Sequence, residues 1–478
     1  MRNKYLIKNV GILTLSNFSS KILVFLLVPL YTSALSLDGV GVYDLVVSTV
    51  GLLFPILTVN IVDAVMRFSM DKAKSHGEII AIALRYTYIG WLLGGVIILI
   101  IRVTGVFPQI AGYEGLVYCY YFFYIFYHLL LQFSKGLEKV ADMGIAGVIS
   151  TVTMLVGNIV LLLVLKYGLK GFFIANVLSQ ALPALYLLFR LRFWEYWHCY
   201  KINTKLQKEM LLYCIPLIAT TLGWWVNSTS DKYVVSFMVG VGANGLLSVA
   251  YKIPQIINVL QGIFIQAWQI SAVKEYGGKD TALFYGRSFN FINVLMCAAC
   301  AWLIILTKPL GHILYQKDFF IAWKYVPFLL VSCVFNSASG FLGPILSAKK
   351  DSKSMAMSAV YGAVTNIVLN IAFVYLIGIQ GATIATIISS FVIYWVRKRA
   401  VCDEIKIIGY SSILITWLLL CLQAIIEIYT PFWWIEVVLI VLMLVLNLES
   451  VVSLIRVIKN LIKKNGGQKN ESSCIDTN

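Results

Sequence analysis

Charged residues are scarce in this sequence of 478 residues, at 13%, whereas hydrophobic residues make up 60% and the mean hydropathy is +0.85. Long polar stretches are missing as well, since the longest loop that we expect inside the chain runs only over residues 190–208. A chain of this composition cannot be an ordinary soluble protein, and it has no room for a soluble domain between its apolar runs. We therefore expect an all-α polytopic membrane protein.

Cysteine and histidine form no pattern that indicates a disulfide framework, a metal site or catalysis. The nine cysteines are scattered, and the CxxC motif at Cys297 and Cys300 lies inside an apolar run, where packing explains it better than redox chemistry. The four histidines, His76, His128, His198 and His312, form no cluster. We expect no metal, no cofactor and no catalytic residue. A cleavable signal peptide is also not expected, because the first apolar run (10–35) is too long for one.

Apolar runs long enough to cross a membrane recur along the whole sequence. We expect about fourteen spans, with twelve as the count if the last two do not cross. They lie near residues 10–35, 41–66, 79–101, 115–134, 144–165, 171–189, 210–239, 244–272, 288–307, 324–347, 355–376, 379–396, 409–428 and 432–455.

The net charge of +16 comes from 38 Lys and Arg against 22 Asp and Glu, which invites a nucleic-acid interpretation. The basic residues fall in short clusters between spans, however, as cytoplasmic loops of membrane proteins do. With the N-terminus inside, the inside loops and tails hold 27 of the 38 and the outside loops hold 6. We therefore expect no nucleic-acid partner, both termini in the cytoplasm, and a disordered cytoplasmic tail over 459–478.

Polar side chains recur at helical spacing within two of the expected spans. In the first of these (210–239), Thr220, Trp224, Asn227 and Asp231 share one face, with Lys232 beside them. In the second (244–272), six residues share a face, with Lys252 adjacent. These are Tyr251, Gln255, Asn258, Gly262, Gln266 and Gln269. Lipid rejects such stripes, so they indicate either an aqueous chamber or polar packing between helices, and the number of aligned positions favours the chamber.

The first two spans also carry polar and charged residues. Asn17 and Lys21 share a face of the first span, and Asp44 lies in the second. Asp63 and Arg67 follow near the cytoplasmic end of the second span. Arg67 could be an entrance residue for an anion, or could simply reach the lipid headgroups.

The two halves of the sequence resemble each other. The stretch GFFIANVLS from Gly171 lies 210 positions before GATIATIIS from Gly381, and Gly41–Val47 lies 204 positions before Gly245–Tyr251. Such spacing is typical of transporters built from two repeats with a substrate site between them.

These residues resemble a known family. The opening stretch IKNVGILTLSNFSSKILVFLLVPLYTSALSLDGVGVYDLVV, the segment DAVMRF from Asp63, and the later GLLSVAYKIPQ and GIQGATIAT are similar to polysaccharide-biosynthesis exporters of the Wzx type, in the superfamily that includes MATE exporters and the lipid II flippase. Leu247 departs from the tyrosine expected in that motif. The resemblance implies two six-helix lobes in a V-shaped, MATE-like arrangement: an N-lobe (1–200), a C-lobe (201–400), and two additional helices (401–458).

The resemblance also implies alternating access and a cargo, an undecaprenyl-diphosphate oligosaccharide used for capsule, exopolysaccharide or O-antigen synthesis in the bacterial cytoplasmic membrane. The lipid bilayer, a polysaccharide polymerase and a chain-length regulator are the other expected partners. For the diphosphate we expect Lys21, Lys232, Lys252 and Arg67. For the sugars and the cavity wall we expect Asn17, Asn227, Trp224, Tyr251, Gln255, Asn258, Gln266 and Gln269. For coupling to H⁺ or Na⁺ we expect Asp231, with Asp44 and Asp63 second.

Two alternatives remain open. A MATE-like exporter of cationic molecules would share the fold, although three lysines in the chamber would repel cations. A polytopic glycosyltransferase or polysaccharide polymerase would be an enzyme, but such chemistry needs groups assembled in an extramembrane loop, and the outside loops expected here are short.

Overall fold

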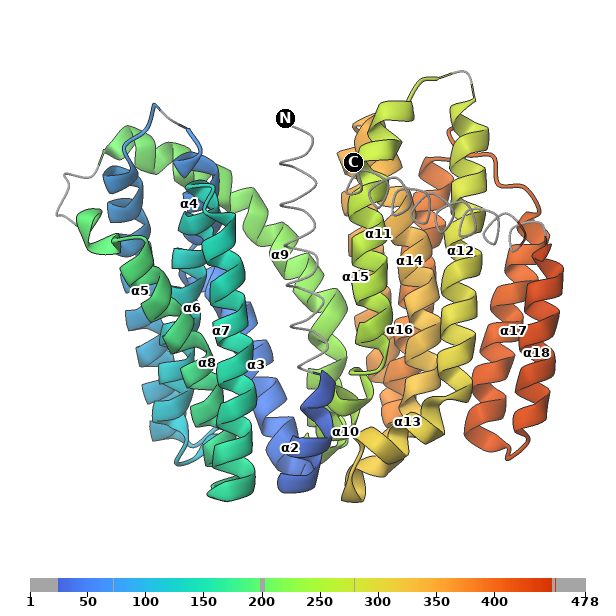
Figure 1. Cartoon of the computed structure of the whole chain (residues 1–478), viewed down its shortest axis with the longest axis horizontal. Helices are drawn as coiled ribbons and strands as arrows, with labels where there is room; N and C mark the ends of the chain where they lie inside the picture. The colour runs from blue at the N-terminus through green and yellow to red at the C-terminus, as the bar shows by residue number, and fades with distance from the viewer. Residues whose placement is uncertain (1–24, 72, 198–202, 279, 449–451, 453–478) are drawn as a thin grey trace, which may run out of the picture. The chain divides into compact units, whose positions relative to one another are not determined.

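The computed structural model describes residues 25–71, 73–197, 203–278, 280–448 and 452, and the regular structure within these ranges is helical (Figure 1). Among the described residues, twelve helices are long and apolar enough to cross a membrane. They are α3 (Leu37–Leu57), α5 (His76–Thr104), α6 (Glu114–Gly136), α7 with η2 (Val140–Val164), α8 (Gly168–Arg190), α9 (Thr204–Met238), α11 (Pro254–Glu275), α12 (Thr281–Ile305), η4 with α14 (Lys317–Lys349), α15 (Ser352–Ile377), α16 (Ile379–Ala400) and α17 (Tyr410–Tyr429).

The shorter helices complete the described chain. They are α2 (Val28–Ala34), α4 (Ile61–Ser69), η1 (Pro108–Ile110), η3 (Phe193–Glu195), α10 (Val241–Ala250), α13 (Thr307–Leu314) and α18 (Trp433–Leu446). The twelve long helices coincide with the second to thirteenth spans expected from hydropathy, and α18 lies at the fourteenth. Most of the first expected span lies outside the described residues.

The chain forms two compact units. The first takes in the described residues up to Ile256, together with Gly311–Ala322 and Asn366–Ala382, and the second takes in the remainder. The lobe boundaries expected at residues 200 and 400 stay predictions.

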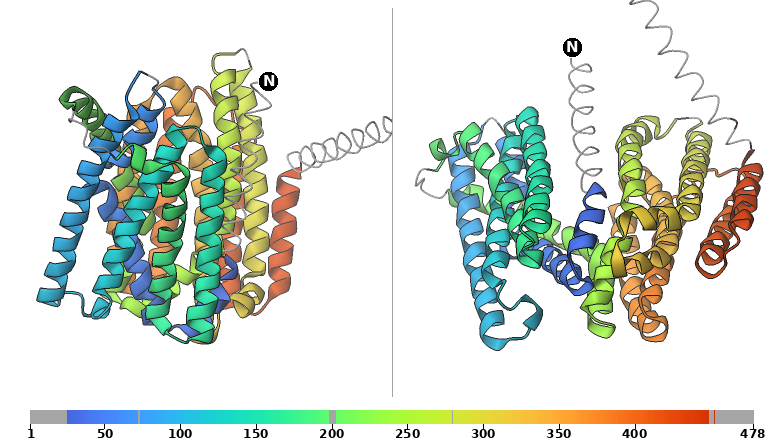
Figure 2. Two further views of the ribbon diagram at one scale, coloured as in Figure 1. Left: turned by 60° about the vertical axis from the view of Figure 1, so that its left-hand side comes forward. Right: turned by 60° about the horizontal axis from the view of Figure 1, so that its bottom comes forward.

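Each unit has its own apolar core. In the first, side chains of α4, α5 and α6 bury Ile61, Ile79 and Phe133 completely. In the second, nearly every residue of α14 from Val326 to Leu346 is buried, so α14 runs through the interior. Helices α17 and α18 are adjacent in the second unit and pack on α12 (Figures 1 and 2).

Two spans expected to be single helices are broken in the structure. The span expected at 41–66 is divided into α3 and α4, because Val59 and Asn60 adopt left-handed backbone conformations with φ of 53° and 51°. The span expected at 244–272 is divided into α10 and α11 at a turn that contains Tyr251 and Lys252. The prediction that Tyr251 continues the face of Gln255 on one straight helix was therefore wrong.

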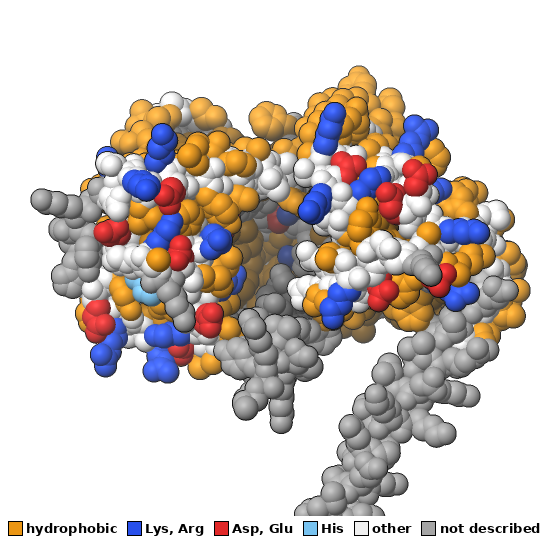
Figure 3. All heavy atoms as spheres, turned by 90° about the horizontal axis from the view of Figure 1, so that it is seen from above, with side chains coloured by type: hydrophobic (Ala, Val, Ile, Leu, Met, Phe, Trp, Pro, Cys, Tyr) orange, Lys and Arg blue, Asp and Glu red, His pale blue; other side chains and the backbone are white. Residues whose placement is uncertain are grey.

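Lys and Arg side chains lie on the face of each unit drawn in Figure 3, interspersed with Asp and Glu. The loops at that face in the first unit include the one after α4, with Lys74, and the one after α8, with Arg192. In the second unit they include the ends of α14 and α16, with Lys350 and Arg399. These are loops that the charge distribution assigned to the cytoplasm.

Candidate functional site

A glycine-mediated helix crossing in the first unit positions the candidate site. Helix α3 packs closely against α10, and Gly41 and Gly245 meet at the crossing. A Cβ on Gly41 would overlap the backbone oxygen of Val241, and a Cβ on Gly245 would overlap that of Leu37. These contacts are reciprocal, because Leu37 and Val241 are also 204 positions apart. Small residues are thus needed here so that the two backbones can approach.

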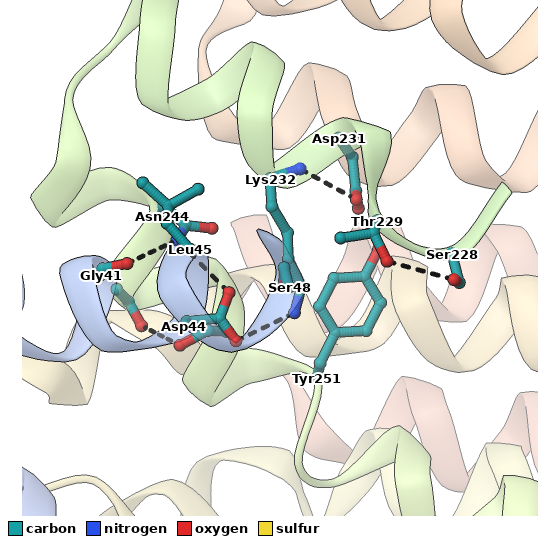
Figure 4. A network of polar contacts seen from close by, with 12 residues as sticks. Gly41, Asp44, Leu45, Ser48, Ser228, Thr229, Asp231, Lys232, Asn244 and Tyr251 are labelled. Atoms are coloured by element: carbon teal, nitrogen blue, oxygen red, sulfur yellow. Dashed lines mark hydrogen bonds and ion pairs between the residues drawn. The ribbon is translucent and has the colours of Figure 1, made fainter. Parts of the chain in front are cut away.

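An ion pair joins α3 to α9 beside this crossing (Figure 4). Lys232 Nζ lies 2.9 Å from Asp44 Oδ1, and the two side chains are only 17% and 15% exposed. Asn244 on α10 donates from Nδ2 to Asp44 Oδ2 at 3.3 Å and to the Gly41 carbonyl oxygen at 3.1 Å. The carboxylate of Asp44 on α3 is therefore held by side chains of α9 and α10.

A second carboxylate lies next to the first. Asp231 on α9 is 3% exposed, and its Oδ2 accepts a short hydrogen bond from the Tyr251 hydroxyl in the turn after α10. Its Oδ1 accepts the backbone N–H of Lys232 at 2.9 Å. Figure 4 shows Asp44, Asp231, Lys232 and Tyr251 grouped together. Four residues singled out in the sequence are thus brought into one network.

Further hydrogen bonds fix α9 against α3. The hydroxyls of Thr49 and Tyr233 are 2.7 Å apart, and Trp225 Nε1 donates to the Ser48 carbonyl oxygen at 2.9 Å. These contacts hold the polar network at a defined register along α3.

The network can exchange charge. The two carboxylates and the Lys232 ammonium are largely buried, so removing one charge leaves its partner uncompensated at a high free-energy cost. A proton on Asp44 or Asp231, or an anion near Lys232, would therefore change which contacts are favoured.

The polar stripe on α11 is exposed to its surroundings. Gln255, Asn258, Gln266 and Gln269 are all exposed, as is the small Gly262. The Asn258 side chain also accepts a contact from Cys333 Sγ at 3.6 Å. The stripe is therefore not buried polar packing between helices.

The stripe predicted on α9 divides into two parts. Trp224 is 68% exposed and Thr220 is also exposed, whereas Asp231 is buried. Asn227 lies between them, is partly buried, and donates from Nδ2 to the Gly223 carbonyl oxygen at 3.0 Å. One end of the stripe thus belongs to the network and the other does not.

Asp63 and Arg67 lie on α4, apart from the network. The Asp63 carboxylate accepts hydrogen bonds from Asn60 Nδ2 at 2.9 Å and Gln132 Nε2 at 2.7 Å. Arg67 is exposed and lines a cavity of about 410 Å³ at the ends of α4 and α9. An ion pair between Lys74 and Glu209, 2.6 Å long, forms part of its wall.

The sequence did not reveal the partners that complete these sites. Asn244, Thr49 and Tyr233 bind the network, and Gln132 holds Asp63. Only Asn244 gave a usable signal, because it directly precedes a glycine of the repeated segment. Asn17 and Lys21 lie outside the described residues. Within the described ranges, no group of three or more His, Cys, Asp and Glu could hold a metal ion.

The sequence matches a known protein family over more than half of its length. The sequence model of a family described as "Polysaccharide biosynthesis protein" matches residues 6–269. No curated protein matches the chain by sequence.

The solved structures that share the fold include a flippase and two transporters. The lipid II flippase MurJ in an inward closed conformation is 16% identical, with 93% of this chain and 98% of that chain covered and a TM-score of 0.64. An inward-facing multidrug resistance MATE transporter of the MOP superfamily is 14% identical, with 81% and 98% covered and a TM-score of 0.59. A MOP superfamily transporter from Pyrococcus furiosus is 14% identical, with 88% and 97% covered and a TM-score of 0.56. The all-helical, MATE-like fold class expected from the sequence is confirmed.

Proposed function

Because this chain belongs to the polysaccharide biosynthesis protein family, we propose that it is a flippase that moves undecaprenyl-diphosphate-linked oligosaccharide repeat units across the bacterial cytoplasmic membrane. The units would serve the synthesis of capsule, exopolysaccharide or O-antigen. The chain is a multi-pass membrane protein, and its fold is shared with a lipid II flippase, a protein named for moving a lipid-linked molecule.

The exposed polar face of α11 is the observation that carries this proposal. Gln266 and Gln269 extend from a helix that is otherwise apolar enough to cross a membrane. An amide without hydrogen-bond partners in hydrocarbon costs roughly 2–7 kcal/mol, so a face with several amides is stable only beside water or a hydrophilic ligand. A glycan headgroup offers hydroxyls that replace the hydrogen bonds of water.

The cargo's diphosphate needs cations. We assign it to Lys232 on α9, Lys252 in the turn before α11, Lys21 in the first expected span, and Arg67 in the cavity at the end of α4. A phosphate that binds Lys232 competes with Asp44 for the same ammonium. The released carboxylate is then favoured to take up a proton or a sodium ion, as is Asp231 beside it. Alternating access would thus be coupled to an ion through Asp44 and Asp231, with Asp63 a separate candidate.

The remaining assignments follow the same scheme. Asn17, Asn227, Trp224, Tyr251, Gln255, Asn258, Gln266 and Gln269 would contact the sugars or line the path. Residues 1–200 and 201–400 would form the two lobes, 401–458 two additional helices, and 459–478 a cytoplasmic tail. Both termini would lie in the cytoplasm, and the basic residues of the loops between the helices support this orientation.

Reconstitution tests this function. The purified protein would be placed in liposomes that contain an undecaprenyl-diphosphate trisaccharide with a fluorescent sugar, and a membrane-impermeant quencher would report the outer leaflet. We expect the protein to increase the exchange of the labelled lipid between leaflets, compared with protein-free liposomes. Efflux of a cationic dye without movement of the labelled lipid would favour a MATE-like exporter and contradict the proposal. Formation of polymer from the labelled lipid would favour an enzyme.

A further inference from the structure

A second buried acidic site lies in the second unit, at the neighbouring ends of α17 and α18. Glu427 near the end of α17 is 4% exposed, Glu436 in the first turn of α18 is 1% exposed, and Gln423, one helical turn before Glu427, is fully buried. Polar residues buried this deeply among apolar helices are costly unless their groups are paired.

The three side chains form one cluster. Gln423 Nε2 donates to the Ala301 carbonyl oxygen of α12 at 2.9 Å and contacts Glu436 Oε2 at 3.4 Å. Glu427 lies one turn after Gln423 on α17, so the hydrogen bond from Gln423 to Glu436 brings the two glutamates to the same place. Two buried oxygens, Glu427 Oε1 and Gln423 Oε1, have no hydrogen-bond partner among the described residues.

The charges of this cluster do not balance. Among the described residues, Lys308 at the start of α13 is the cation that contacts it, with Nζ 3.8 Å from Glu427 Oε2 and 4.8 Å from the centre of the Trp323 ring. One lysine can neutralise one carboxylate, whereas the cluster contains two. Ionisation of both neighbouring buried carboxyl groups is unfavourable away from water, and binding of a proton or another cation by one of them relieves it.

We propose that Glu427 and Glu436 share one exchangeable proton. The proton forms a hydrogen bond between the two carboxyl groups, and Lys308 balances the negative charge that remains. The helices packed against the pair supply a backbone carbonyl from α12, the carboxamide of Gln423 and the Lys308 ammonium. A proton needs only the two carboxyl oxygens, whereas a sodium ion needs a larger set of oxygen ligands.

This proton site is separate from the network around Asp44 and does not depend on the cargo. Loss of the proton would leave two adjacent carboxylates between α17, α18 and α12, and their repulsion would weaken the packing of the last two helices. The packing of α17 and α18 is therefore expected to loosen as the pH rises.

Infrared spectroscopy of the full chain in lipid nanodiscs tests the proposal. We expect a carboxylic acid carbonyl band at neutral pH that shifts in D₂O. Part of this band should be lost in Glu436→Gln and in Glu427→Gln, but not in Glu404→Gln, because Glu404 forms an ion pair with Lys349 at 2.8 Å. The same component should disappear from the wild type as the pH is raised, with a fall in the melting temperature.

Either of two results would overturn the proposal. A wild-type spectrum with no acid band at neutral pH shows that both carboxyl groups are ionised, and this result needs no variant to fold. A band that both variants retain shows that the proton is elsewhere. Removal of the band by sodium chloride at constant pH would instead assign the site to a sodium ion and would also contradict a proton site.

Discussion

At the scale of single residues, the ion pair between Asp44 and Lys232 is the central contact of the polar network. Both residues stood out in the sequence as charges inside apolar spans, but they are 188 positions apart and nothing in the sequence pairs them. Periodicity places a residue on a helix face and cannot say which other helix that face meets. The candidate residues of the network could therefore be predicted, while their partners, such as Asn244, required the structure.

Substitution of Lys232 separates a structural role from cargo binding. Lys232→Met leaves the Asp44 carboxylate without its cation, and loss of one partner of a buried pair costs roughly 3 kcal/mol. The double variant Asp44→Asn/Lys232→Met should regain most of this stability in thermal unfolding. We expect the double variant to exchange labelled lipid about tenfold more slowly than Asp44→Asn alone. A loss of about 1.4 kcal/mol of binding free energy between Lys232 and the phosphate gives that factor. Equal exchange by the two variants would show that Lys232 only neutralises Asp44.

Asp351 provides a prediction about pH. It precedes α15, and its carboxylate accepts the backbone N–H of Ser354 at 2.9 Å and the Ser354 hydroxyl at 2.7 Å. These hydrogen bonds hold the pKa of Asp351 below its ordinary value. Asp351→Ala should therefore lower the melting temperature by a few degrees at neutral pH.

The sign of the pH effect follows from that pKa. The stabilisation by Asp351 is present above the pKa that this group has in the unfolded chain, and it is lost as the pH falls through the folded-state pKa. The difference in melting temperature between wild type and Asp351→Ala should shrink in acid. The exposed Asp403 supplies the control, since Asp403→Ala should have little effect at either pH. A difference that grows in acid would contradict the capping role.

At the scale of helices, hydropathy located the described spans well but not their breaks. The stretch around Val59 and Asn60 is as apolar as its neighbours, and hydropathy does not report backbone dihedral angles. The nearby Pro55 and Pro254 were the local signals. The repeat at a spacing of 204 was visible in the sequence, but its physical meaning, two glycines that let α3 and α10 cross, required the structure.

That crossing gives a prediction with a control on the same helix. Gly41→Ala puts a Cβ against the backbone of α10, so the helices must separate, and we expect a loss of roughly 3 kcal/mol, at the upper end for overpacked sites. Gly51 has nothing within 4 Å of its Cβ position, so Gly51→Ala should be neutral or stabilising by up to about 1 kcal/mol. Thermal unfolding compares the two variants. Equal stability of both would show that the close approach at Gly41 is not needed.

At the scale of the whole molecule, composition and charge distribution were sufficient to predict a polytopic helical protein, and the fold shared with MurJ and MATE transporters confirms that class. The identity of the cargo is a different kind of question. No residue pattern encodes a particular sugar, because amides and aromatic rings bind many glycans alike. The proposed flippase function therefore depends on a physical property that any such cargo needs, which is a hydrophilic path through an apolar chain.

Accessibility of the α11 stripe to water is the most direct test of that path. Gln266→Cys and Asn258→Cys, each made in a chain whose own cysteines are replaced, would be treated with a charged thiol reagent in membranes. Val441→Cys on α18, an exposed apolar position, serves as the lipid-facing control. We predict rapid labelling of Cys at both α11 positions, slowed by added undecaprenyl-diphosphate oligosaccharide, and little labelling at position 441. Labelling at the α11 positions as slow as at position 441 would contradict the account.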